Sequence, residues 1–386
     1  MLRLAFFPLY HYVFREGIHQ RNRRRHRNNM GQRPTVLITG ISGNLGLRLL
    51  RQLPDFNVAG ADIREPEDAS ALARFEKVDL AEERSCDQLL DLMRTHRPEA
   101  VVHLAFVLDP LRTGVVDKKR MWLINVAGTS RVTEAIAEHN RMLGGIDKFI
   151  FPSSALVYGP ELSKPVTEEA PLNAQSLPYA LHQQEADRTV QSRVRGMKCK
   201  TYILRPHVYA GATVQNYQLG VLRGIPGGKG RLAERLRRQG KRLPLWLPSR
   251  GNYLEHRFQF VHVDDVGRLI AHILRRKLAD PKLTVLNVAG RGEPLELRRC
   301  IDIAGIEVQR VPGRTICKQA LRVLWDLGVS DIPPEALPYL LGSSTMDTAR
   351  LRVFLGEHYR TVIEHTCEDA LTDSFSGAEQ LSAARS

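Results

Sequence analysis

The chain has 386 residues, of which 25% are charged and 6% aromatic, and its formal net charge is +14. This length allows one large or two smaller domains with a substantial core. The positive charge is confined to residues 1–29, with a net +6 from seven Arg and one Glu, and to residues 223–250, with a net +8 from nine Lys or Arg and one Glu. The remainder is neutral, so the charge does not indicate a nucleic-acid partner, and we expect none. The five cysteines lack metal-ligand spacing, so we expect no metal site and a reducing, cytoplasmic location.

Residues 1–32 form a basic N-terminal extension. An apolar stretch interrupted by Pro8 precedes a run of arginines. The apolar part is shorter than the roughly 20 residues that span a bilayer, and its charge lies on the wrong side for a secretory signal. A membrane-surface or organelle-targeting segment stays open. We favour a disordered extension, or a true start at Met30, which stands just before the first strand.

From Pro34 the chain alternates apolar strand and amphipathic helix patterns, which predicts an α/β fold with a doubly wound parallel sheet of the Rossmann type. Residues 376–386 are small and polar and are expected to be a disordered tail. We expect strands near 35–40, 57–62, 74–79, 100–106, 147–153, 199–205 and 284–288, and helices near 44–53, 84–95, 118–139, 178–193 and 265–276.

The first strand runs directly into a glycine-rich turn and a helix, with Gly40, Gly43 and Gly46 at the junction. Such glycines permit the tight turn, the approach of a pyrophosphate to the helix N-terminus and close packing of helix on strand. Asp62 ends the next strand about 20 residues later, where a carboxylate binds the ribose hydroxyls of NAD and repels the 2′-phosphate of NADP. Arg64 keeps NADP open as the minority option.

Polar residues also follow the later strands. Asp79 could reach the adenine amino group or cap the following helix. Asn125, inside a long helix, could hold a water or backbone group beneath an active site, although a close contact at Gly128 explains the same segment equally well. His103 ends the fourth strand and more often would be a buried structural residue.

A serine pair ends the fifth strand, and a tyrosine begins the next helix. Ser153 and Ser154 lie at the carboxyl end of the strand, where such sheets bind ligands. Pro178 fixes Tyr179 in the first helical turn, facing back to the edge of the sheet.

The chain resembles the extended short-chain dehydrogenase/reductases. The resemblance is carried by the glycine turn, Asp62, residues 125–129, Ser153-Ser154-Ala155 and Pro178-Tyr179. More narrowly they resemble the NAD-dependent epimerase/dehydratase family typified by UDP-glucose 4-epimerase, over roughly residues 33–365. The segments 204–211, 260–266 and 286–290 agree with this resemblance. It implies NAD as the cofactor, an anionic nucleotide sugar as the substrate, and a homodimer formed by the helices near 118–139 and 178–193.

The resemblance also implies roles for single residues. Tyr179 would be the acid/base, Ser154 the residue that positions the substrate hydroxyl, and Gln183 the ribose contact, at a position where the family has a lysine that lowers the tyrosine pKa. We therefore expect intact cofactor binding but slowed hydride chemistry near neutral pH. The residues expected to bind the cofactor are Gly40, Gly43, Asn44, Leu45, Gly46, Asp62, Ile63, Asp79, Leu80, Leu104, Ala105, Asn125, Ser153, Tyr179, Gln183 and Pro206.

In the family, a smaller substrate-binding domain follows the cofactor domain. We assign residues 33–211 to the NAD-binding domain, with 257–290 returning to it, and residues 212–256 and 291–375 to the substrate domain. Arg257 lies near the diphosphate-binding arginine of the family but is offset by one residue. The helix expected at residues 231–238, with Leu232 and Leu236 inward, is either a basic lid over an anionic substrate or a solvated helix face.

Two departures from the family narrow the reaction. Ala155-Leu156 replaces the acidic pair of the 4,6-dehydratases, so dehydration is not expected. Phe106 replaces the second alanine after the fourth strand, beside the nicotinamide. We therefore expect an oxidoreductase or epimerase that acts on a secondary alcohol. The alternative is a catalytically impaired NAD-binding regulatory or scaffold protein of the same fold.

Overall fold

The computed structural model describes residues 33–108, 114–277 and 279–376. The expectations for residues 1–32 and 377–386 lie outside these residues. Ser376, which we assigned to the tail, is instead the last residue of helix α16 (Cys367–Ser376).

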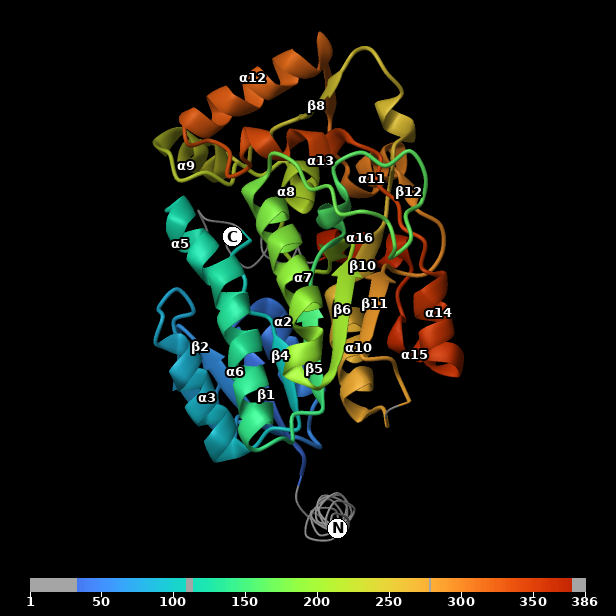
Figure 1. Cartoon of the computed structure of the whole chain (residues 1–386). Helices are drawn as coiled ribbons and strands as arrows, with labels where there is room; N and C mark the ends of the chain where they lie inside the picture. Colours follow the sequence, from blue (N-terminus) through green and yellow to red (C-terminus); the bar gives the residue numbers. More distant parts are fainter. Residues whose placement is uncertain (1–32, 109–113, 278, 377–386) are drawn as a thin grey trace, which may run out of the picture.

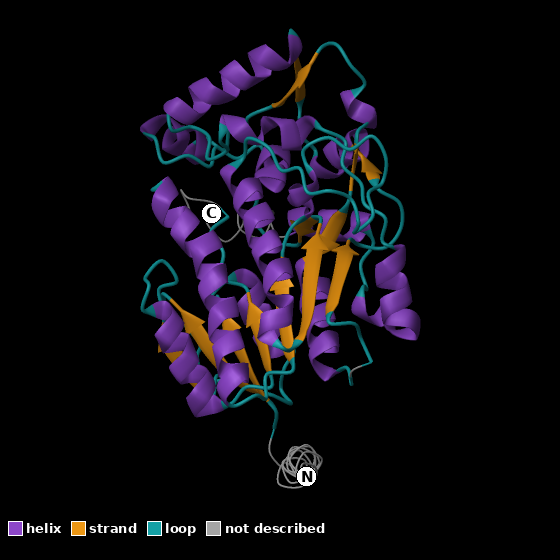
Figure 2. Ribbon diagram, viewed as in Figure 1, coloured by secondary structure: helices purple, strands orange, loops and turns teal. Residues whose placement is uncertain are grey.

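A seven-stranded parallel sheet forms the centre of the molecule (Figures 1 and 2). Its strands are β1 (Thr35–Thr39), β2 (Asn57–Asp62), β3 (Arg74–Lys77), β4 (Ala100–His103), β5 (Lys148–Pro152), β6 (Lys200–Pro206) and β11 (Leu283–Val288). Their order is β11-β6-β5-β4-β1-β2-β3, and every neighbouring pair is parallel. The predicted doubly wound parallel sheet is confirmed, with each expected strand present.

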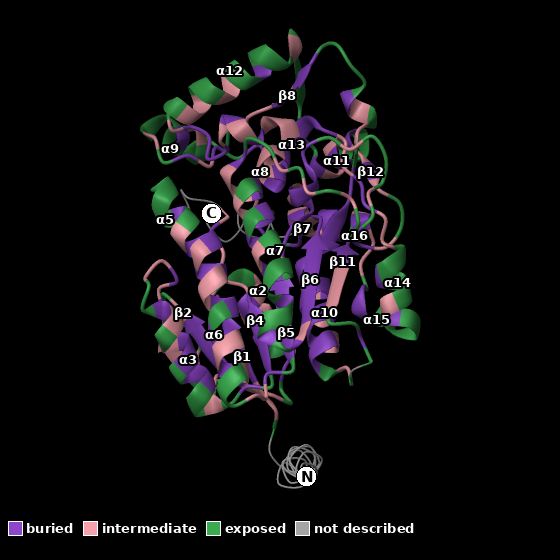
Figure 3. Ribbon diagram, viewed as in Figure 1, coloured by how far each residue is buried: buried purple, intermediate pink, exposed green. Residues whose placement is uncertain are grey.

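Helices cover both faces of this sheet. Successive strand side chains point to opposite faces, so Val36 and Ile38 pack into one core and Leu37 into the other. The first core lies beneath helices α2 (Asn44–Arg51), α10 (Val263–Arg275), α14 (Ala349–Leu355) and α15 (Tyr359–Val362). The second lies beneath α3 (Ser85–His96), α6 (Gly128–Met142) and α7 (Pro178–Met197). The inner strands of the sheet are buried, the edge strands β3 and β11 are partly exposed, and the outer sides of the helices are exposed (Figure 3).

The long helix expected near 118–139 is present in three parts. An α-helical turn, α5 (Lys118–Trp122), passes into a π-helical segment, η1 (Leu123–Ala127), and then into α6. A π-helical turn inserts one residue and often marks a functional position. Asn125 lies in this segment, and a Cβ on Gly128 would lie 2.9 Å from the Cβ of Leu80. The close helix contact at Gly128 is therefore present beside Asn125.

A smaller layer lies beyond the carboxyl ends of the strands (Figure 1). It has its own core, which includes Leu219, Phe258, Leu297 and Leu371. Its pairs are β7 (Val208–Ala210) with β10 (Phe260–His262), β8 (Leu245–Pro248) with β13 (Val308–Val311), and β9 (Arg257–Phe258) with β12 (Leu295–Glu296). Its helices are α8 (Tyr217–Arg223), α9 (Arg231–Arg238), α11 (Leu297–Ala304), α12 (Gly313–Asp326), α13 (Leu337–Leu341) and α16.

The basic helix expected at residues 231–238 is α9, but its buried side differs from the expectation. Leu232 is 45% exposed, whereas Ala233 is fully buried. The expectation that Leu232 faces inward was therefore wrong, because this short helix makes its contact through Ala233. Within the described ranges, no helix combines the length and the apolar character needed to cross a bilayer.

Candidate functional site

In the glycine turn the backbone packs so closely that a side chain at Gly40 or Gly46 would clash with neighbouring backbone atoms. Gly40 has a φ of +75°, and a Cβ there would lie 2.4 Å from the backbone nitrogen of Ala105. A Cβ on Gly46 would lie 2.4 Å from the carbonyl oxygen of Ile41. Helix α2 begins at Asn44, directly after Gly43. The N-terminus of α2 therefore borders the cavities on either side with its backbone N–H groups open, which suits an anionic group.

On one side of the turn lies a cavity of about 720 Å³, which holds the carboxylate of Asp62 at its wall. Asp62 Oδ2 accepts a hydrogen bond from the Ser42 backbone N–H (3.0 Å), and Oδ1 accepts one from Ile63 N–H (2.7 Å). The carboxylate is thereby fixed at the end of β2. The expected residues Ile63, Asp79, Leu80, Leu104 and Ala105 line the same cavity.

Asp79 supports a turn and not the start of a helix. Its Oδ1 accepts from Ala81 N–H at 2.9 Å, and its Oδ2 pairs with Arg120 at 2.5 Å. Helix α3 starts at Ser85, so the expectation of a helix N-cap at Asp79 was wrong. The side chain nevertheless lines the cavity, as the alternative assignment required.

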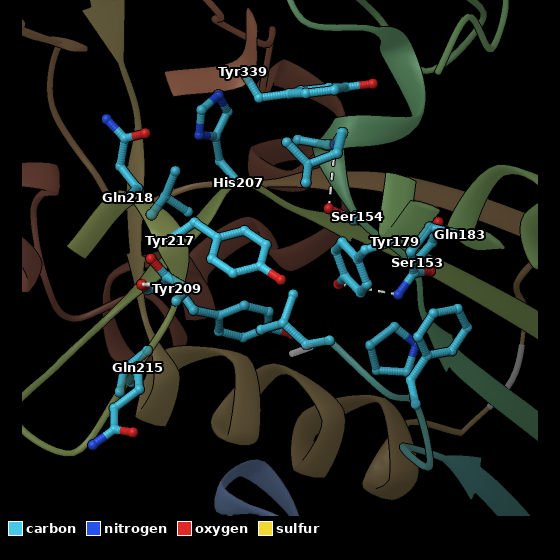
Figure 4. A pocket seen from close by; sticks show the side chains of 18 of the residues that line it. Ser153, Ser154, Tyr179, Gln183, His207, Tyr209, Gln215, Tyr217, Gln218 and Tyr339 are labelled. Carbon is cyan, nitrogen blue, oxygen red and sulfur yellow. Dashed lines mark hydrogen bonds between the residues drawn. The ribbon is translucent and has the colours of Figure 1, made fainter. Parts of the chain in front are cut away.

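On the other side of the turn lies a cavity of about 350 Å³, with Tyr179, Gln183, Ser153 and Ser154 in its wall. Gln183 Nε2 donates a hydrogen bond to the Tyr179 hydroxyl at 3.2 Å, one helical turn away on α7 (Figure 4). Ser154 Oγ accepts from Leu156 N–H at 3.2 Å, which orients it at the start of the short helix η2 (Ala155–Tyr158). The three expected residues are thus brought together.

The protonation state of Tyr179 follows from its surroundings. Burial raises the pKa of Tyr179, while hydrogen bonds from Gln183 and Ser154 oppose this shift. A hydrogen bond from a neutral amide favours the phenolate less than a full positive charge would. At neutral pH, Tyr179 is therefore a phenol that holds its proton.

One atom of Gln183 has no protein partner. Its Oε1 is buried and accepts no hydrogen bond in the described structure, although its Nε2 is bound to Tyr179. A buried acceptor without a donor costs free energy. Gln183 itself lines the cavity of Tyr179.

Asn125 acts through the backbone and does not line either cavity. Its Oδ1 accepts from Val107 N–H at 2.7 Å, and its Nδ2 donates to Val107 O at 3.0 Å. The segment that it holds contributes Leu104, Phe106 and Leu108 to the cavity of Tyr179. The sequence analysis left open whether Asn125 holds a backbone group or whether the segment serves a close helix contact at Gly128. Both are present in the structure.

His103 is a buried structural residue, as its sequence position indicated. Its Nε2 donates to Thr129 Oγ1 at 3.0 Å, because that hydroxyl donates in turn to Asn125 O, and its Nδ1 accepts from Thr39 Oγ1 at 2.6 Å. Burial lowers the pKa of His103 to about 3, so the ring is neutral at pH 7.

A buried ion pair beneath the serines was missed by the sequence analysis. Arg205 binds Asp187 through two hydrogen bonds, 2.9 Å from Nε to Oδ2 and 3.1 Å from Nη2 to Oδ1. Ser153 Oγ donates to the same Asp187 Oδ2 at 2.7 Å, and Arg205 Nη1 donates to the Tyr158 hydroxyl at 2.8 Å. The pair joins the ends of β5 and β6 to α7, and thereby positions Ser153 and its neighbour Ser154 relative to Tyr179. Its sequence signal was Arg205, a charged residue that directly follows the apolar residues Ile203 and Leu204 of β6.

Besides Asn125, two more expected residues are outside both cavity linings. Arg257 is exposed and lies 3.7 Å from Glu296, whereas its neighbour Phe258 lines the cavity of Tyr179. Alternate residues of a strand face opposite sides, so the offset of one residue turns Arg257 outward. Pro206 lies at the end of β6 and is not part of either lining.

The arginines around the basic segment bind the protein itself. Arg237 donates to the carbonyl oxygens of Pro226 and Gly228, and Arg242 donates to four carbonyl oxygens, including that of Gly305. Arg238 pairs with Glu234 on the same helix. None of the described residues of α9 lines either cavity, which favours the solvated helix face over the basic lid.

A cluster of His262, Asp265 and His365 also brings possible metal ligands within 4.8 Å of one another. Two of its ring nitrogens already form hydrogen bonds. His262 Nδ1 accepts from Asp264 N–H, and His365 Nδ1 donates to Asp265 within the cluster. Arg268 forms an ion pair with Asp265 and supplies the positive charge. The cluster fastens α10 to the C-terminal segment.

Comparison with known proteins matches residues 36–289 to the NAD dependent epimerase/dehydratase family. The UDP-glucose 4-epimerase of Azospirillum brasilense is 30% identical over 182 residues, 46% of this chain and 50% of that protein. UDP-glucose 4-epimerase 1 of Oryza sativa subsp. japonica is 31% identical over 160 residues, 38% of this chain and 42% of that protein. The chain thus spans half or less of the length of these two curated relatives.

Solved structures share the fold over nearly the whole chain. MoeE5 in complex with UDP-glucuronic acid and NAD has a TM-score of 0.60 at 20% identity, covering 90% of this chain and 99% of that one. The UDP-glucose 4-epimerase of Thermus thermophilus in complex with NAD has a TM-score of 0.60 at 21% identity, covering 89% and 99%. At these identities the likeness establishes the architecture and leaves the substrate open.

Proposed function

The chain belongs to the NAD-dependent epimerase/dehydratase family, and we propose that it is an enzyme that interconverts a secondary alcohol and a ketone through Tyr179. The observation that carries this proposal is the Tyr179 hydroxyl, which lies in the wall of a cavity beside Ser154 and within 3.2 Å of Gln183 Nε2. That cavity begins at the glycine turn, so a dinucleotide bound across the turn would reach the phenol.

The residues present fit NAD, which when bound supplies the hydride acceptor. The space above Gly40 and Gly43 and the N-terminus of α2 would hold the diphosphate. Asp62 would accept hydrogen bonds from the adenosine ribose and disfavour a 2′-phosphate. The unpartnered Oε1 of Gln183 would accept a hydrogen bond from the second ribose.

Tyr179 would exchange the proton of the substrate oxygen. In the direction of reduction, the protonated phenol donates to the oxygen of the ketone, and Ser154 Oγ orients that oxygen. In the direction of oxidation, a phenolate must accept the hydroxyl proton, and the raised pKa of Tyr179 makes this form scarce at neutral pH. We therefore expect reduction to be the faster direction near pH 7.

The substrate class is suggested by the relatives, and the oligomeric state by the surface. Their names indicate UDP-glucose as a substrate, so a nucleotide sugar is a candidate here, with oxidation either transient, as in an epimerase, or net. The helices α5, α6 and α7 form one side of the molecule, and Trp122 and Leu181 are exposed there at 45% and 38%. A cytoplasmic homodimer formed through this side is part of the proposal.

A second candidate is an NAD-binding regulatory protein with impaired catalysis. Gln183 at the position of the family lysine, together with the raised pKa of Tyr179, favours it. The hydrogen bonds that hold Tyr179 and Ser154 in position favour the enzyme.

Binding and turnover separate these candidates. NADH binding would be followed by its fluorescence, and turnover by its near-ultraviolet absorbance, with panels of ketones, secondary alcohols and nucleotide sugars. We expect Tyr179→Phe to abolish turnover while the Kd for NADH stays unchanged. Tight binding of NADH without turnover of any compound would favour the regulatory protein, and failure to bind NADH would reject both.

A further inference from the structure

The cavity in front of Tyr179 contains no charged side chain among the described residues that line it. Tyr209 and Tyr217 extend from one wall toward Tyr179 and Gln183 on the other, and Tyr339 and His207 lie across the top (Figure 4). Leu156, Leu177, Phe258, Ala336 and Leu340 complete the apolar part of this wall. The cavity therefore presents aromatic rings and aliphatic groups to whatever lies beside the phenol.

The Tyr339 hydroxyl and His207 Nε2 are used within the protein. The Tyr339 hydroxyl accepts from Gln175 N–H at 2.8 Å and donates to Gln175 O at 3.1 Å. His207 Nε2 donates to Ser344 O at 3.0 Å. Burial lowers the pKa of His207 to about 4, so this ring is neutral at pH 7 and supplies no positive charge.

Arg257, Arg223, Arg237 and Arg242 of the surrounding layer do not supply a positive charge to this cavity. Arg257 points outward while Phe258 takes the place in the lining. Arg223 donates to Val214 O and Ser374 O, and the donors of Arg237 and Arg242 bind carbonyl oxygens. Among the described residues that line this cavity, none supplies a cation to replace the hydration that a diphosphate would lose on entering it.

The size of the cavity also favours a small substrate. Its volume of about 350 Å³ is near the lower end of the roughly 300–1,000 Å³ of small-molecule pockets. The nicotinamide end of the cofactor must share it. A compact substrate fits the remaining space better than a sugar joined to a diphosphate and a nucleoside.

Resting on the proposed function, we propose that the substrate is a compact, uncharged and largely apolar ketone or secondary alcohol, held between Tyr209, Tyr217 and Tyr339. The ketone gains a hydride from NADH at its carbon and a proton from Tyr179 at its oxygen, which gives the alcohol, NAD⁺ and the phenolate. Solvent returns the proton to Tyr179. The aromatic rings supply apolar contact area and edge-to-face packing in place of charge recognition.

The test compares two classes of ligand on the wild-type protein saturated with NADH. Acetophenone serves as the neutral aromatic ketone, and UDP and UDP-glucose serve as the anionic probes, each titrated by calorimetry and assayed for turnover. We expect acetophenone to bind at least about tenfold more tightly than UDP-glucose, since the described part of the lining offers no cation, and to be reduced. Tighter binding of UDP or UDP-glucose, or no binding of acetophenone, would overturn the proposal.

A pair of variants at one position locates the effect. Tyr217→Arg places a guanidinium in the lining, and Tyr217→Phe keeps the ring and its neutrality. We expect Tyr217→Arg to bind acetophenone at least about tenfold more weakly than Tyr217→Phe, and to bind UDP more tightly than Tyr217→Phe. Both should bind NADH normally. If Tyr217→Arg does not fold, the wild-type titration decides alone. Equal acetophenone binding by a folded Tyr217→Arg and by Tyr217→Phe would overturn the placement.

The same measurements separate this inference from the proposed function. Turnover of UDP-glucose but not of acetophenone would reject the apolar substrate class, while the proposal that the protein is an enzyme would hold. Binding of acetophenone to the NADH complex without turnover of any ketone or alcohol would reject the enzyme while the preference of the cavity for neutral ligands stands.

Discussion

In the proposed reaction, the rate depends on Tyr179 and Gln183. Burial raises the pKa of Tyr179, and the donor of Gln183 supports the phenolate only through a neutral hydrogen bond. A positive charge at the same distance would favour the phenolate more strongly. The position of Gln183 therefore sets the balance between the acid and the base form of the phenol.

We expect Gln183→Lys to speed alcohol oxidation at neutral pH. Below the pKa of Tyr179, each unit by which the pKa falls gives about tenfold more phenolate, so the midpoint of the pH–rate profile should move to lower pH. Gln183→Met, which lacks the donor, should move the midpoint the other way. Profiles of kcat/KM for the three proteins check this, and coincident profiles would contradict it.

His103 makes stability depend on pH. Above pH 6.5 its ring is neutral in the folded and in the unfolded chain. As the pH falls, the unfolded chain binds a proton that the folded chain refuses until about pH 3. Each such group therefore lowers the free energy of unfolding by about 1.4 kcal/mol per pH unit between these limits.

We predict that His103→Gln makes urea unfolding less sensitive to acid between pH 6 and 4, by about 1.4 kcal/mol per pH unit. Adding His207→Gln should reduce the slope further, because the pKa of His207 is also lowered, to about 4. Parallel curves for the wild type and His103→Gln would show that the histidine is not the cause.

At the scale of elements, the π-helical segment η1 holds the loop that follows β4. Asn125 makes two hydrogen bonds with the backbone of Val107, and the loop supplies Leu104 and Phe106 to the cavity. The ring of Phe106 packs edge-to-face on Tyr179, with centroids 5.7 Å apart. The loop therefore connects a buried amide to the catalytic phenol.

We expect Asn125→Leu to free this loop and to weaken NADH binding. Leaving the buried N–H and C=O of Val107 unpaired costs about 1–3 kcal/mol for each group, which favours opening of the loop. Faster hydrogen exchange at the Val107 amide, together with a raised Kd for NADH, checks this. Protection equal to that of the wild type would contradict the assigned role.

The buried pair of Asp187 and Arg205 connects α7 with β6, and both side chains are at most 2% exposed. We predict that Asp187→Ala lowers the free energy of unfolding by about 3–5 kcal/mol, because Arg205 is left buried without a counter-charge. Arg188→Ala, one residue along on the exposed side of α7, is the matched control and should cost less than about 1 kcal/mol. Guanidinium denaturation of both variants measures the difference, and equal costs would contradict the prediction.

The sequence predicted the elements whose signals are local. The glycine turn, β2 at residues 57–62, and the helical spacing of Tyr179 and Gln183 all follow from neighbouring residues. The pairing of Asp187 with Arg205 could not be predicted, because it depends on how α7 lies against β6. Arg257 was expected to bind the substrate, but it faces outward for another reason. In a strand, an error of one residue in the alignment exchanges the two faces. Helix α12 was not predicted, although Cys317, Ala320, Leu321 and Leu324 have helical spacing and turn toward the protein.

At the scale of the whole molecule, two cores on either side of the sheet support a third at the carboxyl ends of the strands. The glycine turn and the start of α7 meet between the sheet and this third core. The outer side of α5 and α7 carries exposed Trp122 and Leu181. Exposed aromatic residues of this kind are enriched at protein interfaces.

We expect a homodimer in solution that uses this side. Trp122→Glu combined with Leu181→Glu should convert it to a monomer, since buried unpaired carboxylates oppose association. Light scattering coupled to size-exclusion chromatography measures the mass, and exposed Val353→Glu on α14, a residue 83% exposed on the other face, is the control. A monomeric wild type would contradict the expectation.

The carboxylate of Asp62 has two tasks that cannot be varied separately. The oxygen that would discriminate against a phosphorylated adenosine also accepts the Ser42 N–H and so holds the glycine turn in shape. Replacing Asp62 with a small neutral residue to admit NADP would therefore also remove the hydrogen bond to Ser42 N–H, and the glycine turn that would bind the diphosphate would become less ordered. A successful exchange of coenzyme requires a second acceptor for Ser42, which means that cofactor choice in this protein is coupled to the integrity of its first turn.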